Sequence, residues 1–272
     1  MISASSKQDA KDGIAQIQEL ILSHCGLDLR TGKEELISAR IGTVMRQRNL
    51  PSLKHYYEYV MADTSGAALT EMVDVLTTNF TSFFRESAHF DLLRKTIIPA
   101  AKGKSLRIWS AGCSSGEEPY TIGFHLHDAG MDSKSAEIIA TDISDKVLKK
   151  ASAGVYSEDQ LKEVPADARR RYFMEGIGAK KGLYRVRPEI MQMVKFRNHN
   201  LMQPFATEKP FDVIFCRNVM IYFNKVTQRA VLGHLTQRLK SGGYLFIGHS
   251  ESLNGLDKHL KYVCPAVYQS VT

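Results

Sequence analysis

A short stretch at residues 106–120 (LRIWSAGCSSGEEPY) constrains the fold more than any other part of the chain. Its apolar start indicates a buried strand, and its glycines at 112 and 116 indicate a tight turn. Pro119 is tolerated in the first turn of the helix that follows, because the first amides of a helix have no partner. About 25 residues later, the stretch 137–142 (EIIATD) ends on Asp142, close to the spacing at which doubly wound sheets place a carboxylate on ribose hydroxyls. The two stretches together predict an α/β domain with a nucleoside-cofactor site.

The loop between this strand and helix indicates which kind of cofactor is bound. A dinucleotide places its pyrophosphate against a G-x-G-x-x-G loop, whereas this loop reads GCSSG and is followed at once by Glu117 and Glu118. Carboxylates at a helix start suit the helix dipole but repel a pyrophosphate, which disfavours a hydride-transfer enzyme. They suit a cofactor with a cationic part, such as the amine and sulfonium of S-adenosylmethionine. The alternative is that the two acids only stabilise the start of the helix.

Composition sets the outer limits. The chain has 272 residues, 43% of them hydrophobic and 24% charged, as is ordinary for a globular protein with a real core. A formal net charge of +7 favours an acidic partner, but it does not choose among a nucleic acid, a membrane surface and an acidic protein. No apolar run approaches the roughly 20 residues needed to span a bilayer, so we expect a cytoplasmic protein without membrane insertion.

The cysteines and histidines give no metal signal. The four cysteines are scattered without a C-x-x-C pair, which favours buried thiols over disulfides or zinc ligands. His125 and His127 lie two positions apart on a predicted helix, hence on different faces. His249 follows a predicted core strand and is expected to be part of a hydrogen-bonded structure. The sequence therefore predicts no metal site.

Helical periodicity dominates the chain before residue 76. After about ten loose polar residues we expect helices over residues 14–25, 33–49, 53–61 (capped by Ser52) and from Ala67 onward. We therefore predict three parts: a small all-α domain (10–76), a connector (77–94) and an α/β domain (95–272).

Beyond Asp142, helices and strands alternate as in a parallel α/β sheet. A glycine-containing segment with one alternating strand interrupts this rhythm and predicts an inserted antiparallel hairpin at about residues 172–188. Further strands are expected at residues 192–196, 211–216 (FDVIFC), 244–248, 262–263 and 267–270, which gives roughly seven in total. Helices are expected over residues 88–98 and about 225–240.

Two further features each leave two interpretations open. The connector TTNFTSFFRE (77–86) either seals two domains together through its phenylalanines, or turns Asn79, Thr81 and Arg85 toward the cofactor. The second predicted helix has an excess of bases, with Arg40 inside its apolar face and Arg46 opposite. It forms either an ordinary solvated face or a basic surface that binds an acidic partner helix.

Taken in order, five stretches resemble the CheR-type methyltransferases, which methylate glutamates of bacterial chemoreceptors. They are TTNFTSFFRE (77–86), GCSSGEEPYT (112–121), ATDIS (140–144), IFCRNVMIYF (214–223) and GHSES (248–252). The resemblance covers nearly the whole chain. It implies a Rossmann-like class I S-adenosylmethionine-dependent methyltransferase domain with an inserted small antiparallel β-subdomain, preceded by a small all-α domain.

The resemblance also implies roles for individual residues, position by position. Contacts with S-adenosylmethionine, or with its product S-adenosylhomocysteine, are implied for Asn79, Thr81, Arg85, Glu117 (methionine amine), Asp142 (ribose), Asn200 and Leu201 (adenine), Asn218 and Val219. Arg85 and Tyr222 are the implied catalytic residues at the reaction centre.

The implied partner is the cytoplasmic helical bundle of a chemoreceptor, which the N-terminal helices bind through Arg40 and Arg46. The inserted hairpin is compatible with binding a short peptide at the receptor's C-terminal tail, as in some members of the family. The protein is expected to act as a monomer and not to bind nucleic acid.

Two other classes of function are disfavoured by the residues after the strand 211–216. An amine-directed nucleic-acid methyltransferase would show an [Asn/Asp]-Pro-Pro-aromatic turn there, but the chain reads Arg217-Asn218-Val219-Met220. A cysteine-nucleophile methyltransferase would have proline before the cysteine, but Cys216 follows Phe215. A non-catalytic regulator that only binds the cofactor would lack methyl transfer, which an assay with labelled cofactor detects.

Overall fold

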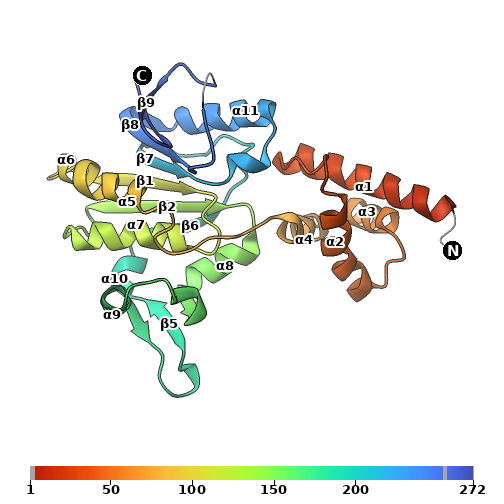
Figure 1. Ribbon diagram of the computed structural model, residues 1–272, viewed down its shortest axis with the longest axis horizontal. Coiled ribbons are helices and arrows are strands. Elements are labelled where there is room, and N and C mark those ends of the chain that lie inside the picture. The colour runs from red at the N-terminus through yellow and green to blue at the C-terminus, as the bar shows by residue number, and fades with distance from the viewer. Residues whose placement is uncertain (1–3, 254–255, 272) are drawn as a thin grey trace. The chain divides into compact units, whose positions relative to one another are not determined.

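The computed structural model describes residues 4–253 and 256–271, with the backbone alone for residues 4–10 (Figure 1). Contacts along the chain divide it into two compact units. The first unit contains the chain up to Thr78 together with Tyr222–Gln228, and the second contains Asn79–Ile221 and the chain from Arg229 onward.

The first unit is helical, as predicted. Its helices are α1 (Ala4–Cys25), α2 (Glu34–Arg48), α3 (Leu53–Ala62) and α4 (Ala67–Leu76). The Ser52 side chain accepts a hydrogen bond from the His55 N–H and so caps α3 as expected. Gly13 lets α1 approach α3 closely, because a Cβ there would lie 2.6 Å from the backbone nitrogen of Lys54.

The prediction that α1 begins near residue 14 after a loose polar segment is wrong, since the helix begins at Ala4. Residues 4–10 (ASSKQDA) have no apolar periodicity, so the pattern that predicted the rest of the helix gives no signal in this segment. A helix already fixed by packing can extend through such residues at little cost, because propagation adds one hydrogen bond per residue.

The second unit is built on a seven-stranded sheet of order β6-β2-β1-β7-β8-β10-β9. The first five strands in this order are parallel, and β10 and β9 add antiparallel at one edge. The strands are β1 (Leu106–Ala111), β2 (Ala136–Asp142), β6 (Val194–Asn198), β7 (Phe211–Cys216), β8 (Leu239–Ile247), β9 (Leu260–Cys264) and β10 (Val267–Ser270). This is the predicted Rossmann-like sheet, in which ligands bind at the carboxyl ends of the parallel strands.

Helices cover this sheet on both sides, and α7 (Glu117–Asp128) and α11 (Lys225–Thr236) lie on opposite faces (Figure 1). The predicted helix over residues 88–98 is α5 (Ala88–Leu92), a π-helical turn (Leu93–Ile97) and α6 (Ile98–Ala100). After β2 comes α8 (Asp145–Ala153), capped by the side chain of Ser144. The core between sheet and helices is apolar and fully buried; it includes Ile108, Phe124, Ile138, Val213, Phe215 and Phe246.

The inserted subdomain is a three-stranded antiparallel sheet of order β3-β5-β4, on the α7 side of the main sheet (Figure 1). The predicted hairpin is present as β4 (Phe173–Glu175) and β5 (Leu183–Val186). The third strand, β3 (Val155–Ser157), was not predicted, because three residues are too short to show an alternating pattern. Helices α9 (Ala166–Tyr172) and α10 (Pro188–Met191) flank the sheet.

Two smaller boundaries also differ from the sequence expectation. The helix expected to reach residue 240 ends at Thr236, and β8 begins at Leu239 instead of residue 244.

All four cysteines are free thiols; three are buried and Cys264 is half-buried. In the part of the chain that the structure describes, no helix has both the length and the apolarity to cross a bilayer.

Candidate active site

The turn after β1 is held against the end of β2. The backbone N–H groups of Gly112 and Cys113 both donate to the carbonyl of Thr141, at 2.8 and 2.9 Å. Gly112 and Ser114 adopt positive φ values of 83° and 50°. A Cβ on Gly112 would lie 2.5 Å from Cγ2 of Val219, so the turn packs directly on a residue predicted for the same site. Only glycine fits this position.

Asp142 ends β2, as predicted, and its carboxylate is buried and fixed. Oδ2 accepts the N–H of Ser114 at 2.8 Å and Oδ1 accepts that of Ser144 at 3.0 Å. The carbonyl of Asp142 accepts the N–H of His199, which directly precedes the predicted adenine contacts Asn200 and Leu201. The carboxylate therefore joins the turn, the start of α8 and the segment after β6 at one edge of the sheet.

Asn200 and Leu201 are half-buried and locally ordered. The Asn200 side-chain oxygen accepts the N–H of Met202 at 3.0 Å. The carbonyl oxygen of Leu201 lies 3.1 Å from Nδ1 of His234 on α11. Both residues follow β6, the strand that pairs with β2 up to Asp142.

Glu117 is a buried carboxylate at the start of α7. Its oxygens accept hydrogen bonds from the Ser115 hydroxyl at 2.7 Å and from the Gln160 amide at 3.3 Å. Burial raises the pKa of Glu117, and these bonds together with the charge of Lys150 oppose that rise only in part. A carboxylate with this incomplete compensation suits a ligand that brings a positive charge. The residues present therefore fit the amine of S-adenosylmethionine.

Glu118 does not share this role. Its carboxylate turns to the Ser110 hydroxyl (2.7 Å) and to Nη1 of Arg217 (3.1 Å). Both acids were candidates for pairing with a cationic cofactor, but the partners of Glu118 in the structure are protein groups. Adjacent residues on a helix point about 100° apart, which separates the two carboxylates.

The connector lies against the turn through its backbone. The carbonyl of Asn79 accepts the Ser114 hydroxyl at 3.1 Å, and the N–H of Phe84 donates to Thr121 on α7 at 3.2 Å. Phe83 is buried against Phe124, with ring centroids 5.9 Å apart. The connector thus packs on the α/β core and contacts the turn through its backbone, whereas cofactor contacts of Asn79, Thr81 and Arg85 stay a prediction.

The side chains of Arg85 and Phe80 contact each other and are not part of this packing. Phe80 is 74% exposed, which contradicts a sealing role for that phenylalanine. The Arg85 guanidinium donates to the Phe80 carbonyl at 3.0 Å and lies over its ring, 5.5 Å from the centroid. Thr81, like Arg85, is half-buried.

Arg217, a buried arginine that was not predicted from the sequence, contacts the connector. Nη2 of Arg217 is 3.0 Å from Oε2 of Glu86, Nη1 contacts Glu118, and Nη2 also donates to the carbonyl of Arg85. The signal available in the sequence was a charged residue directly after the apolar strand FDVIFC. A cation at a buried strand end requires carboxylate partners, although the sequence alone does not identify them.

Asn218 and Val219 follow at the same strand end. Asn218 has a φ of 58°, and its side-chain amide donates to Oε1 of Glu86 at 3.3 Å. Glu251, another residue not predicted, accepts the N–H groups of Asn218 (3.0 Å) and Ile221 (3.1 Å). The motif GHSES thus holds the segment after β7 in place.

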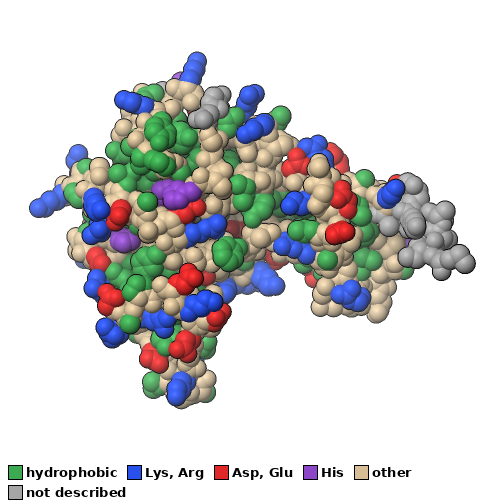
Figure 2. Space-filling view, in the orientation of Figure 1, with side chains coloured by type: hydrophobic (Ala, Val, Ile, Leu, Met, Phe, Trp, Pro, Cys, Tyr) green, Lys and Arg blue, Asp and Glu red, His purple; other side chains and the backbone are tan. Residues whose placement is uncertain are grey.

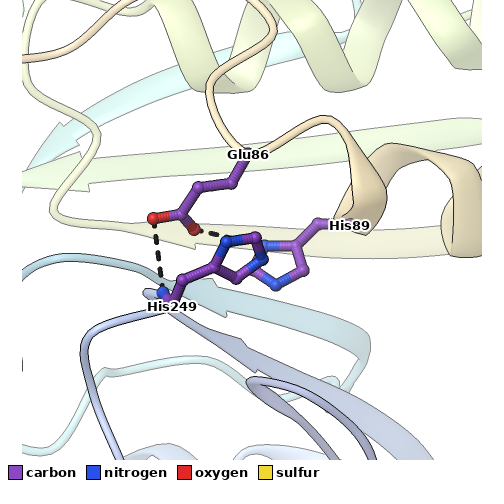
Figure 3. Close-up of side chains that lie close together, drawn as sticks. All are labelled: Glu86, His89 and His249. Atoms are coloured by element: carbon purple, nitrogen blue, oxygen red, sulfur yellow. Dashed lines mark hydrogen bonds and ion pairs between the residues drawn. The ribbon is translucent and has the colours of Figure 1, made fainter.

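Glu86, His89 and His249 lie close together beside this network (Figure 3). Their ligand-type atoms all lie within 4.8 Å of one another, and the N–H of His249 donates to Glu86 at 3.3 Å. Burial, the charge of Arg217 and His249 lower the pKa of His89 to about 4. Neutral imidazoles and a carboxylate are common metal ligands, but here Arg217 already pairs with the carboxylate and its charge opposes a second cation. The absence of a metal site stays a prediction.

In the first unit, the two predicted docking arginines differ. Arg40 is half-buried and its guanidinium donates to the carbonyls of Leu76 (2.8 Å) and Thr77 (2.9 Å), so it caps the end of α4. Arg46 is exposed and donates to the Thr43 hydroxyl at 3.1 Å. Tyr222 also belongs to this unit, and its carbonyl accepts the N–H of Asp28 at 2.9 Å.

The small subdomain contains a cleft of about 420 Å³. Basic and aromatic side chains line it, among them Arg169, Arg170, Arg187, Phe173 and Tyr184. In Figure 2, Lys and Arg side chains are interspersed with Asp and Glu over the subdomain around α9 and β5.

Comparisons with known proteins find relatives over most of the chain. Residues 12–77 match the family model described as CheR methyltransferase, all-alpha domain, and residues 79–268 match CheR methyltransferase, SAM binding domain. A chemotaxis protein methyltransferase from Borreliella burgdorferi is 36% identical over 95% of this chain and 94% of its own. One from Salmonella typhimurium is 38% identical over 93% and 88%. The solved N-methyltransferase NodS from Bradyrhizobium japonicum WM9, with S-adenosylhomocysteine, covers 70% of this chain and 69% of its own at 14% identity; its TM-score of 0.36 is too low to support any statement about function.

Proposed function

The chain belongs to the CheR methyltransferase family, and on that premise we propose that it transfers the methyl group of S-adenosylmethionine to glutamate side chains of bacterial chemoreceptors. It is a S-adenosylmethionine-dependent methyltransferase related to those of chemotaxis. The step from methyltransferase to receptor glutamates is the proposal. The observation that carries it is the match of both family domains, from residue 12 to residue 268.

The cofactor, when bound, supplies a methyl group on a sulfonium centre. We assign the ribose to Asp142 and the methionine amine to Glu117, because one is a fixed acceptor at a strand end and the other a buried carboxylate that lacks full compensation. Asn200 and Leu201 would border the adenine. The remaining proposed contacts are Asn79, Thr81, Arg85, Asn218 and Val219.

The proposed reaction needs no general base. A glutamate carboxylate has an ordinary pKa of about 4.3 and is ionised at neutral pH, so it is already a nucleophile. The protein must align that oxygen with the methyl group, and orientation can contribute roughly 7–11 kcal/mol at best. It must also keep the incoming carboxylate ionised while water is excluded, since desolvation raises a carboxyl pKa.

Arg85 is our first candidate for the second task, because a guanidinium stabilises a carboxylate by charge and by paired N–H donors. Tyr222 is the second candidate, through its phenol. Both follow from their places in the motifs TTNFTSFFRE and IFCRNVMIYF.

For partners, we propose that the helical unit binds the cytoplasmic helical bundle of the receptor and that the protein works in the cytoplasm as a monomer. The exposed Arg46 suits an acidic helix surface. The basic cleft of the small subdomain suits an acidic peptide at the receptor's C-terminal tail. No nucleic acid is required by this function.

The experiment is methyl transfer from tritium-labelled cofactor to receptor cytoplasmic fragments, followed by treatment with base. A glutamate methyl ester releases its label as volatile methanol in base, whereas an N-methyl group does not. We expect base-labile label on the fragment and none on DNA or RNA. Base-stable label on the fragment, or label on nucleic acid only, would contradict the proposal.

A further inference from the structure

We propose that Arg217 is a positioning residue that fixes the backbone of Arg85 for methyl transfer. This inference rests on the proposed function, in which Arg85 acts on the incoming carboxylate. The Arg217 side chain is only 2% exposed and all its hydrogen bonds go to other residues of the protein, so we assign it no contact with the substrate.

The first argument is where the Arg217 guanidinium donates its hydrogen bonds. One nitrogen, Nη2, contacts both the carbonyl of Arg85 and Oε2 of Glu86, so it grips two consecutive residues of the connector. Nη1 donates to Glu118 on α7 at 3.1 Å. The guanidinium also lies over the ring of Phe90, 5.4 Å from its centroid. The connector is therefore tied to α7 and to the end of β7 through one side chain.

The second argument is backbone strain on both sides of Arg85. Phe84 has a φ of 58° and Glu86 a φ of 55°, in the left-handed region that non-glycine residues rarely adopt. Such residues persist only where their surroundings hold them, and they concentrate at functional sites. For Glu86 the holding groups are Arg217, the amide of Asn218 and the N–H of His249.

The third argument is charge. Arg217 lies between two carboxylates, and their pKa values respond differently. Burial raises the pKa of Glu86, but the charge and hydrogen bonds of Arg217, together with the hydrogen bonds from His249 and Asn218, lower it overall. For the more deeply buried Glu118, burial wins and the pKa is raised. The connector's carboxylate is thus kept ionised and paired, which holds the pair Arg85–Glu86 in one conformation.

A planar fork is needed for these contacts. A lysine at position 217 would keep the positive charge, but its single ammonium could not reach Glu86, Glu118 and the Arg85 carbonyl together. Arg217→Lys therefore tests geometry separately from charge. Arg107 offers a matched control: it is a partly buried arginine at the start of β1 that pairs with Glu137 at 2.7 Å and lies 4.6 Å from the centroid of Phe211.

The test is a double-mutant cycle on the full chain, with Arg217→Lys, Arg85→Ala, the combination and Arg107→Lys. The readouts are kcat for methyl transfer to receptor fragment, Kd for S-adenosylhomocysteine by calorimetry, and Tm. We expect Arg217→Lys to lower kcat about 100-fold, as for a small misplacement of a reacting group. We expect Kd to change less than about 3-fold, and no further loss of kcat when Arg217→Lys is added to Arg85→Ala. Arg107→Lys should leave kcat unchanged.

If the two losses of kcat multiply in the double variant, the residues act independently and the proposal is overturned. An Arg217→Lys protein with unchanged kcat would also overturn it. If Arg217→Lys does not fold, Glu86→Gln enters the same cycle, because it removes the charge that Arg217 pairs with and keeps the side-chain shape. A wild-type protein that does not methylate the fragment would contradict the proposed function instead. A crystal structure of the Arg217→Lys protein tests the positioning role without an activity assay. Unchanged φ angles at Phe84 and Glu86 would overturn that role.

Discussion

Oε2 of Glu86 lies 3.0 Å from Nη2 of Arg217, although the two residues are 131 positions apart in the sequence. Glu86 ends the motif of the connector, and Arg217 directly follows β7. Their ion pair joins two of the stretches on which the family resemblance rests. Two bonds from Ser114, to Asp142 and to the carbonyl of Asn79, also join the connector and the end of β2 to the turn after β1.

Arg85→Ala should reduce methyl transfer far more than cofactor binding. The guanidinium is proposed to stabilise charge at the reacting oxygen, and loss of one such donor costs on the order of 100- to 1,000-fold in kcat. We expect a change of less than about 10-fold in the Kd of S-adenosylhomocysteine, measured by calorimetry. Equal losses in both quantities would make Arg85 a cofactor ligand and nothing more.

Asp142→Ala should act mainly on cofactor affinity. The substitution removes the proposed acceptor for the ribose hydroxyls, and it also frees the N–H groups of Ser114 and Ser144. We expect binding of S-adenosylhomocysteine to weaken at least about 10-fold, which corresponds to about 1.4 kcal/mol. Asp142→Asn keeps one acceptor oxygen and should lose less. Calorimetry that shows unchanged affinity for both variants would remove Asp142 from the site.

Gly112→Ala should destabilise the turn after β1. Its φ of 83° strains any side chain, and the new Cβ would lie 2.5 Å from Cγ2 of Val219. We expect the free energy of unfolding to fall by about 1–3 kcal/mol in a denaturant titration. Adding Val219→Ala removes the clash but not the strain, so it should restore part of the loss. A double variant that is no more stable than Gly112→Ala would show that the contact with Val219 is unimportant.

Stability should depend on His89 below neutral pH. The folded protein holds the pKa of His89 at about 4 against an ordinary 6.5, so the unfolded chain binds an additional proton between these values. The contribution of His89 is therefore complete above pH 6.5 and is lost as pH falls toward 4, by up to about 3 kcal/mol. His89→Gln should flatten the dependence of Tm on pH in that window, whereas the exposed control His259→Gln should not. Parallel profiles for wild type and His89→Gln would contradict a buried neutral imidazole.

The two arginines of α2 should separate stability from docking. Arg40 caps α4 through the carbonyls of Leu76 and Thr77, so Arg40→Ala should lower Tm by several degrees, for a loss of about 1–2 kcal/mol. Arg46 is exposed, and Arg46→Glu should leave Tm unchanged while it raises KM for the receptor fragment. An unchanged KM for Arg46→Glu would remove that residue from the docking surface.

Much of the fold follows from local sequence pattern. β1, the glycine turn, α7 and the acid that ends β2 have their signals within a few residues, and the structure has them where they were predicted. Strand β7 agrees residue by residue, because a short apolar run that ends at Arg217 and Asn218 has only one strong interpretation.

What the pattern missed depends on distant residues or on weak local signals. The three-residue strand β3 exists only because β5 pairs with it, and the first turns of α1 have no apolar face to detect. At the proposed site, the sequence predicted roles for Asn79, Arg85, Glu117 and Asp142. It gave none for Arg217 or Glu251, which hydrogen-bond to other residues of the protein. Arg217 and Glu118 are 99 residues apart in the sequence, and Glu251 and Asn218 are 33 apart. In a doubly wound sheet such contacts join distant segments, so no local spacing reveals them.

Tandem mass spectrometry of a receptor cytoplasmic fragment after incubation with the protein and S-adenosylmethionine tests the central claim most directly. The account predicts methyl groups on glutamate side chains of the fragment. It predicts none when those glutamates are replaced by alanine and almost none with the Arg85→Ala protein. Methyl groups on lysine, arginine or the chain terminus would contradict the assignment of this protein as a glutamate methyltransferase. So would a fragment that stays unmodified although intact S-adenosylmethionine is present in excess.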